Sequence, residues 1–293
     1  MIMKALLFPG QASQFVGMGK ALLENKEIGQ PRLLQADRIL GFKISQVMAD
    51  GSEEDLRQTN VTQPAVFLHS VIMAEIVGDL NPDAVAGHSL GEFSALVCNQ
   101  VLTFEQGLEL VRIRAEAMRK ACDQIPGTMA AIVGLDDEVV EEICSKMQGV
   151  VIAANYNCPG QLVISGEITA VTDACIRLSE AGARRAIPLA VGGAFHSPLM
   201  QPAAEELAKA VNESHFGDPS CPIYQNVDGL PQNNPESIKE NLILQLTSPV
   251  RWTSTIMQMI KDGITEFTEV GGIGKVLQAM VKRIDKDTVT NAL

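Results

Sequence analysis

The sequence predicts an α/β protein whose main sheet is parallel, and three observations lead to this prediction. Short apolar segments that fit buried strands, such as MKALLF at 3–8 and DAVAGH at 83–88, are followed by segments with helical patterning. Strands that alternate with helices favour a parallel sheet. The order of elements changes in the middle of the chain, which indicates a second, smaller unit. The length of 293 residues fits about two domains, or one large domain with an insertion.

The composition indicates a globular enzyme and argues against a nucleic-acid-binding protein. Hydrophobic residues make up 46% of the chain and charged residues 20%, which is enough for a substantial core. A net charge of −12 and only 4% aromatic residues do not suit phosphate contacts or base stacking. The six cysteines form no C-x-x-C pair, so reduced thiols and no metal are expected. Because no apolar run fits a signal peptide or a membrane span, we expect a cytoplasmic protein.

The first part of the chain is expected to begin the parallel sheet. The strand at 3–8 ends at Pro9-Gly10, because proline and glycine interrupt regular structure. A helical pattern starts at Pro64, where the first turn of a helix tolerates proline. The expected elements, in chain order, are a strand at 3–8, helices at 17–24 and 64–80, a strand at 83–88, and helices at 90–98 and 105–121.

The middle of the chain predicts a ferredoxin-like subdomain, because its elements follow the order β-α-β-β-α-β. The four strands are expected at 128–135, 149–157, 160–166 and 183–191, and the two helices at 136–147 and 167–182. We place this subdomain at residues 125–192. It divides the large domain into a first part at 1–124 and a second part at 193–293.

The α/β pattern returns after the subdomain. The expected elements are a helix at 199–214, a strand at 221–227, helices at 236–247 and 252–262, a strand at 264–270 and a helix at 275–284. The large domain is therefore discontinuous in sequence. Ligand pockets favour such domain junctions.

A candidate nucleophile lies in the segment Gly87-His88-Ser89-Leu90-Gly91, which fits G-x-S-x-G. An apolar strand precedes this segment and a helix follows it, so the serine sits on a sharp turn where flanking glycines let the two elements pass closely. The backbone N–H of Leu90, at the helix N-terminus, can stabilise an oxyanion there. The alternative is a serine that merely occupies a turn.

A nucleophilic serine needs a base, and the chain has four histidines. His196 is the best candidate, because it stands in the glycine-rich loop VGGAFHSPLM after the last strand of the subdomain. His69 lies in an apolar helical stretch and is expected in the core. His88 is too constrained on the serine turn to act as the base, and His215 is expected on the surface.

Arg114 gives a clue to the substrate. On the helix at 105–121 it stands four residues after Leu110 and four before Met118, within the apolar stripe. A guanidinium on that face is costly unless an anion pairs with it. The partner is either a carboxylate of the protein, which makes the arginine structural, or a substrate carboxylate held by two hydrogen bonds.

These features together resemble the malonyl-CoA:acyl-carrier-protein transacylase family over essentially the whole chain. The segments that carry the resemblance are FPGQASQFVGMG, GHSLGEFSAL, VRIRAEAM, GAFHSPLM, YQNVDG, LILQLTSPVRW and EVGGIGKVL. The resemblance implies an α/β-hydrolase-like large domain with a parallel sheet and an inserted ferredoxin-like subdomain. It implies ping-pong transfer of malonyl from malonyl-CoA to the phosphopantetheine thiol of acyl carrier protein, with no cofactor and no metal.

The resemblance also implies roles for seven residues. They are Ser89 as nucleophile, His196 as base, the Gln245 backbone carbonyl as the acceptor that orients the imidazole, the backbone N–H groups of Gln11 and Leu90 as oxyanion hole, Arg114 as ligand of the malonyl carboxylate, and Phe195 as a residue that narrows the acyl pocket. The chain departs from the family in one block, which usually reads G-Q-G-S and here is Gly10-Gln11-Ala12-Ser13. If residue 12 needs a positive φ, alanine costs about 1 kcal/mol there.

The sequence leaves alternatives open for the surface that docks the partner and for the class of reaction. Acyl carrier proteins of this class are acidic, and because this chain is acidic too, docking needs a local basic patch. The candidates are Arg184, Arg185, Lys275, Lys282 and Arg283. Family members are often monomers, which is the expectation here. The alternatives to malonyl transfer in fatty-acid synthesis are a serine thioesterase or hydrolase on a related scaffold, a polyketide-pathway acyltransferase, and a non-catalytic module that docks carrier proteins.

Overall fold

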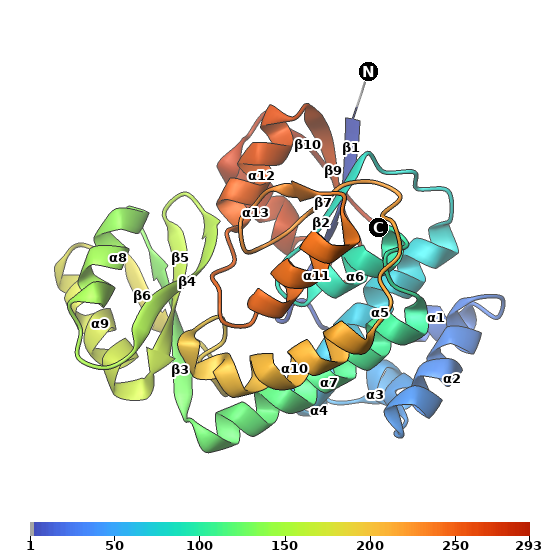
Figure 1. Ribbon diagram of the computed structural model, residues 1–293, viewed down its shortest axis with the longest axis horizontal. Helices are drawn as coiled ribbons and strands as arrows, with labels where there is room; N and C mark the ends of the chain where they lie inside the picture. Colours follow the sequence, from blue (N-terminus) through green and yellow to red (C-terminus); the bar gives the residue numbers. More distant parts are fainter. Residues whose placement is uncertain (1–2) are drawn as a thin grey trace.

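The computed structural model describes residues 3–293 and has two β-sheets, each covered by helices (Figure 1). The larger sheet has the strand order β10-β9-β1-β2-β7-β8, and all its pairs are parallel except β7 with β8. Its strands are β1 (Met3–Phe8), β2 (Ala84–Gly87), β7 (Ile223–Tyr224), β8 (Pro231–Gln232), β9 (Ile264–Glu269) and β10 (Val289–Ala292). The predicted α/β class with a mainly parallel sheet is confirmed.

Alternation along β1 explains why both faces of this sheet are covered. Leu6 and Phe8 pack into the larger core, whereas Ala5 and Leu7 pack into a second core on the opposite face. The larger core is formed with helices α1 (Lys20–Glu24), α2 (Gly29–Leu40), α3 (Ile44–Asp50), α4 (Glu53–Arg57), α5 (Thr59–Val77), α6 (Gly91–Cys98), α7 (Phe104–Gln124), α10 (Gln201–Glu213) and α11 (Pro235–Leu244). The second is formed with α12 (Trp252–Lys261) and α13 (Val276–Ile284). None of the helices in residues 3–293 has the length and apolar character needed to cross a membrane.

The smaller sheet is antiparallel, with the strand order β4-β5-β3-β6 (Figure 1, left). Its elements are β3 (Gly127–Val133), α8 (Asp137–Ser145), β4 (Val151–Cys158), β5 (Gln161–Glu167), α9 (Ile168–Glu180) and β6 (Arg185–Pro188). The predicted ferredoxin-like order β-α-β-β-α-β is therefore confirmed. Ala130 and Ile132 face α8 and α9, while Met129 and Val163 join the larger core on the other face. The domain boundaries at 124/125 and 192/193 stay predictions.

Backbone hydrogen bonds join the two sheets. The N–H of Tyr156 on β4 donates to the Val250 carbonyl at 2.9 Å, and the Val250 N–H donates to the Ala154 carbonyl at 2.8 Å. The Arg283 guanidinium on α13 also donates to the side chain of Gln161 on β5 at 2.8 Å. The small sheet also meets the carboxyl end of β2, where His88 Nε2 lies 2.9 Å from the Asn157 side-chain oxygen on β4.

Some elements differ from the sequence prediction. Helix α5 begins at Thr59, five residues before the predicted start, so Pro64 lies inside the helix, where it removes one intrahelical hydrogen bond. The predicted strand at 221–227 is only two residues long, Ile223–Tyr224. Helices α2 to α4 and strands β8 and β10 were not anticipated from the sequence. Strands β8 and β10 are short strands at the edges of the sheet and are defined only by pairing with their neighbours. Helix α4 is too short for its sequence to show a helical repeat.

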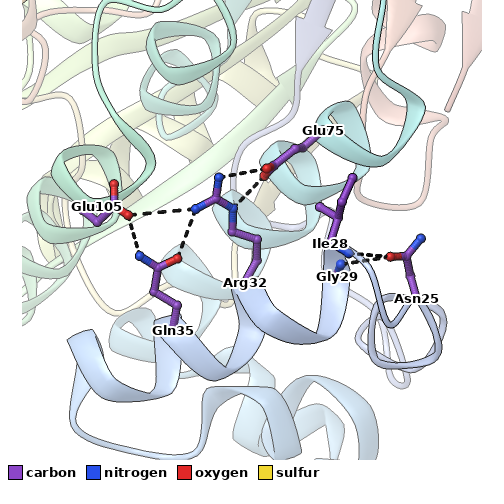
Figure 2. A network of polar contacts seen from close by, with 7 residues as sticks. All are labelled: Asn25, Ile28, Gly29, Arg32, Gln35, Glu75 and Glu105. Carbon is purple, nitrogen blue, oxygen red and sulfur yellow. Dashed lines mark hydrogen bonds and ion pairs between the residues drawn. The ribbon is translucent and has the colours of Figure 1, made fainter.

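Helix α2 is fixed to α5 and α7 by a polar network (Figure 2). The Arg32 guanidinium donates two hydrogen bonds of 2.8 Å to the Glu75 carboxylate, and the Gln35 amide donates to Glu105. The guanidinium also lies over the Phe104 ring, 4.7 Å from its centroid. The Glu75 hydrogen bonds raise the pKa of Arg32, so this arginine stays charged and paired. The network positions α2 but lies away from the serine turn.

We expect Gly91→Ala to lower the free energy of unfolding by at least 1–3 kcal/mol, roughly the cost of overpacking a core. Gly91 begins α6, and a Cβ there would lie 1.9 Å from the Phe8 carbonyl oxygen of β1. Urea unfolding measures the effect. Gly192→Ala is the control, since its Cβ would meet nothing within 4 Å. Equal stability of the two variants would show that the close approach of α6 to β1 is not required.

Candidate active site

Ser89 lies on a strained turn between β2 and α6. Its φ is 53°, in the left-handed region that non-glycine residues rarely adopt. The Asn226 side chain holds the turn from both sides, because its oxygen accepts the Ser89 N–H at 2.6 Å and its amide donates to the Gly87 carbonyl at 2.6 Å. Strained backbone of this kind is kept where the surroundings determine it, often at functional sites.

The structure brings His196 into contact with Ser89. The serine Oγ lies 2.7 Å from His196 Nε2, and His196 Nδ1 lies 3.0 Å from the Gln245 carbonyl oxygen and 3.2 Å from that of Ser248. Two carbonyl acceptors at Nδ1 assign the proton to that nitrogen, so Nε2 is free to accept the serine proton. Burial, and secondarily the charge of Arg114, lower the pKa of His196 to about 3. The imidazole is therefore neutral at neutral pH.

Arg114 lies beside the same serine and is fully buried. Its Nη1 donates to the Gln63 side-chain oxygen at 2.6 Å, and its Nη2 donates to Ser89 Oγ at 3.0 Å and to the Gln245 side-chain oxygen at 3.3 Å. Within residues 3–293 this guanidinium forms no ion pair with an Asp or Glu, and its Nε has no hydrogen-bond partner. The alternative of a direct internal ion pair is therefore wrong.

Burial lowers the pKa of Arg114 to about 9, and the charge of Glu92 opposes that shift. The guanidinium thus remains charged at neutral pH. A buried cation without a carboxylate partner is costly to maintain, and a bound anion would relieve that cost.

Two backbone N–H groups near Ser89 have no acceptor. Neither the Gln11 N–H nor the Leu90 N–H donates a hydrogen bond to any of residues 3–293. The loop that carries Gln11 is shaped by the Ser13 hydroxyl, which donates to the Gly10 carbonyl at 2.6 Å. Free donors next to a nucleophile can receive charge that develops on a carbonyl oxygen.

Ser89 and His196 line a cavity of about 370 Å³ between the two sheets. Such a volume suits a small ligand or part of a larger one. The lining residues are Gln11, Ala12, Gln14, Arg57, Thr59, Thr62, His88, Ser89, Met129, Asn155, Val163, Leu189, Ala190, Val191, Gly192, Phe195 and His196. A larger cavity of about 840 Å³ near the ends of α5 and α6 contains none of the predicted site residues, so we assign the site to the smaller one.

Several polar residues at the site were not identified from the sequence. Gln63 contacts Arg114, and Asn226 contacts Ser89. The Ser248 carbonyl is the second acceptor that faces His196. Glu92, in the first turn of α6, accepts hydrogen bonds from the Gln245 side chain and from the Asn226 N–H. The only available signal was a set of polar residues inside apolar segments, and that pattern does not say what they contact.

The other histidines lie as expected. His69 is buried and accepts the Gly272 N–H at 3.1 Å, and burial lowers its pKa to about 4. His88 Nε2 lies 2.9 Å from the Asn157 side-chain oxygen on β4, and burial lowers its pKa. His215 is exposed.

The proposed basic patch is dispersed over two elements. Arg184 and Arg185 are exposed at the start of β6, while Lys275, Lys282 and Arg283 are exposed on and beside α13. None of them lines the 370 Å³ cavity. Their role in docking a carrier protein stays a prediction. Within residues 3–293 there is also no group of three or more His, Cys, Asp or Glu placed to hold a metal ion.

We expect Ala12→Gly to raise the free energy of unfolding by up to about 1 kcal/mol, because alanine is strained at a positive φ. Ala12 has a φ of 73°, which is the condition inferred from the unusual G-Q-A-S block. Urea unfolding of the two proteins tests this expectation. A variant that is less stable than the parent would show that the unfolded-state entropy of glycine outweighs the strain.

Comparisons with known proteins agree with this geometry. Residues 5–292 match the family model described as the acyl transferase domain. The chain is 42% identical to the malonyl CoA-acyl carrier protein transacylase of Bacillus subtilis (strain 168), over 99% of this chain and 92% of that protein. It is 38% identical to the protein of the same name from Staphylococcus aureus (strain MW2), over 97% of this chain and 92% of that protein.

Solved structures have the same fold. An acyl carrier protein S-malonyltransferase from Vibrio cholerae matches with a TM-score of 0.93 and 42% identity, over 99% of this chain and 96% of that one. A malonyl-transacylase in complex with a type II PKS acyl-carrier protein matches with a TM-score of 0.94 and 38% identity, over 99% of this chain and 96% of that one. By its whole-length match and its fold, the chain belongs to the acyl transferase family.

Proposed function

We propose that the protein transfers a malonyl group from malonyl-CoA to the phosphopantetheine thiol of acyl carrier protein through a malonyl ester of Ser89. One observation carries the choice of acyl group. The charged guanidinium of Arg114 lies 3.0 Å from Ser89 Oγ, fully buried and with no carboxylate of residues 3–293 paired to it. An acyl group that ends in a carboxylate supplies the missing anion.

In the first half-reaction, His196 Nε2 takes the proton of the Ser89 hydroxyl while Oγ forms a bond to the thioester carbon. The carbonyl oxygen becomes an oxyanion, which the N–H groups of Gln11 and Leu90 stabilise. Collapse of this intermediate breaks the carbon–sulfur bond. The CoA thiolate leaves with the proton that His196 returns, and malonyl remains on Ser89.

The second half-reaction reverses these steps with a different thiol. The phosphopantetheine thiol of the carrier protein gives its proton to His196 and attacks the ester carbon. The bond to Ser89 Oγ breaks, and the serine oxygen recovers the proton from His196. The malonyl group leaves on the carrier, and the free enzyme is restored with no net change in protons.

Two further groups on the cavity wall suit the pantetheine arm. Asn155 is largely buried and its side-chain oxygen has no partner, so it can accept an amide N–H of the arm. Arg57 carries a positive charge on the wall, where a substrate phosphate would meet it, and its present partner is the exposed Glu53. CoA and the carrier-bound arm both contain these amides and a phosphate.

The main alternative, a serine thioesterase, needs a carboxylate that orients the base and an open route for water. His196 Nδ1 instead faces two backbone carbonyls. This favours transfer over hydrolysis. A polyketide-pathway acyltransferase shares the same chemistry and differs in the carrier served. Monomeric state and a cytoplasmic location remain part of the proposal.

Mass spectrometry after brief incubation with malonyl-CoA tests the proposal. We expect a mass increase of one malonyl group on the peptide that contains Ser89, lost when acyl carrier protein is added, and no increase in Ser89→Ala, which lacks the nucleophile. Competition by other acyl-CoAs for this labelling ranks the acyl groups. Rapid release of free CoA and malonate without an acceptor would instead establish a hydrolase.

We expect Arg114→Ala to lower kcat/KM for malonyl transfer by at least about a hundredfold, the loss of roughly 3 kcal/mol from one charge-assisted contact. Acetyl transfer should be retained or rise, since an acetyl group has no carboxylate. Steady-state kinetics with malonyl-CoA and acetyl-CoA measure the ratio. If both activities fell equally, Arg114 would serve the structure of the site and the choice of malonyl would be wrong.

A further inference from the structure

Glu92 is a buried carboxylate that the reaction above does not use. Its side chain is fully inaccessible to solvent. One oxygen accepts a hydrogen bond from the Gln225 amide at 2.8 Å, and the other accepts from the Gln245 amide at 2.8 Å and from the Asn226 backbone N–H at 3.3 Å. All three partners are donors.

This set of partners requires an ionised carboxylate. A protonated Glu92 would bring an O–H against N–H donors and would find no acceptor among them. Burial raises the pKa of Glu92 to about 7, while the three hydrogen bonds and the charge of Arg114 oppose that rise. The geometry therefore describes a buried anion held by neutral donors, with a cation nearby.

Two of the three residues that donate to Glu92, Asn226 and Gln245, also contact the reacting residues, whereas Gln225 donates to the Ile238 carbonyl. Asn226 accepts the Ser89 N–H through its side chain. The Gln245 amide also donates to the Ser89 carbonyl at 3.0 Å, its side-chain oxygen accepts from Arg114, and its backbone carbonyl faces His196 Nδ1. Through Asn226 and Gln245, this one carboxylate is thus connected to the nucleophile, the base and the candidate anion ligand.

Gln245 lies between the two charges. Its amide donates to Glu92 and its side-chain oxygen accepts from Arg114, so the carboxylate acts on the guanidinium without occupying its donors. The other side chains that contact or face the guanidinium are neutral: the Ser89 hydroxyl, Gln63 from α5, the Phe93 ring at 5.7 Å from α6, and the uncharged His196. Glu92 is therefore the negative charge that acts on Arg114 within the described chain.

We propose that Glu92 is a positioning residue, whose carboxylate holds Asn226 and Gln245 in place and, through the Gln245 side chain, holds the Arg114 guanidinium beside Ser89. Only the second part of this inference, which concerns Arg114, depends on the proposed malonyl transfer. The first part concerns the placement of Ser89 and His196, whatever acyl group they carry.

Glu92→Gln removes the charge and keeps two of the three hydrogen bonds. Its amide oxygen can face the Asn226 N–H and the Gln245 amide, while its NH2 group meets the Gln225 NH2 group and loses that bond. We expect malonyl kcat/KM to fall about tenfold or more at pH 8, with the acetyl value less affected. The malonyl-to-acetyl ratio should fall by a similar factor at every pH, since Arg114 keeps its proton and only its placement changes.

Glu92→Asp and Glu269→Gln complete the set. Aspartate keeps the charge, so it should restore more of the malonyl-to-acetyl ratio than glutamine does, even if its shorter side chain lowers kcat. Glu269 is also fully buried, and it accepts three backbone N–H groups at the start of α13 instead of contacting Ser89, His196 or Arg114. Glu269→Gln should therefore reduce stability without changing the malonyl-to-acetyl ratio.

Labelling of Ser89 by a fluorophosphonate tests the placement without any thioester. We expect Glu92→Ala to label at least about tenfold more slowly than the parent and Glu92→Gln to label at a similar rate. Circular dichroism of each variant establishes that it is folded. If Glu92→Ala does not fold, comparison of Glu92→Gln with Glu92→Asp still tests the charge.

Two outcomes would overturn the inference. If Glu92→Gln has the parental malonyl-to-acetyl ratio at every pH, the charge of Glu92 does not hold Arg114 in place. If folded Glu92→Ala labels at the parental rate, the carboxylate does not position Ser89. A parent that shows no preference for malonyl over acetyl would contradict the proposed function instead, and the labelling comparison would still decide the positioning role.

Discussion

The guanidinium of Arg114 is the feature on which the rest of the site depends. It is buried beside the Ser89 hydroxyl and is surrounded by neutral oxygens from Gln63 and Gln245. A protein carboxylate in direct contact would lower the cost of burying this charge, but it would also occupy the donors that a substrate needs. The structure instead keeps Glu92 one side chain away, so the cation is stabilised while its donors contact only neutral groups.

Two residues near this charge have backbone conformations that non-glycine residues rarely adopt. Ser89 and His196 both have positive φ values, 53° and 56°, and their side chains meet at 2.7 Å. Conformations of this kind persist only where the surroundings fix them. Asn226 and the glycines of the turn fix the serine, and the carbonyls of Gln245 and Ser248 fix the imidazole.

Local patterns predicted much of the fold and the principal reacting pair. The apolar run at 3–8 predicted β1 with the limits that the structure shows. Successive residues of this strand pack alternately into the two cores, so both faces are apolar. Arg114 was conspicuous because a charge interrupts an apolar stripe. Asn226 and Glu92 were not identified, since their hydrogen bonds join residues 137 and 134 positions apart in the chain. The short strands β7 and β8 exist only through pairing with neighbours, so no local pattern could give their limits.

The same electrostatic requirement explains why His196 faces carbonyl groups. A carboxylate at Nδ1 would favour the imidazolium and would place a second negative charge close to the acyl pocket. It would therefore weaken the attraction of Arg114 for an anionic acyl group. Carbonyl oxygens fix the same tautomer without adding charge, and the imidazole stays neutral beside a cation. A base oriented by Gln245 and Ser248, with the Glu92 carboxylate behind Gln245, therefore suits an acyl group that has its own negative charge.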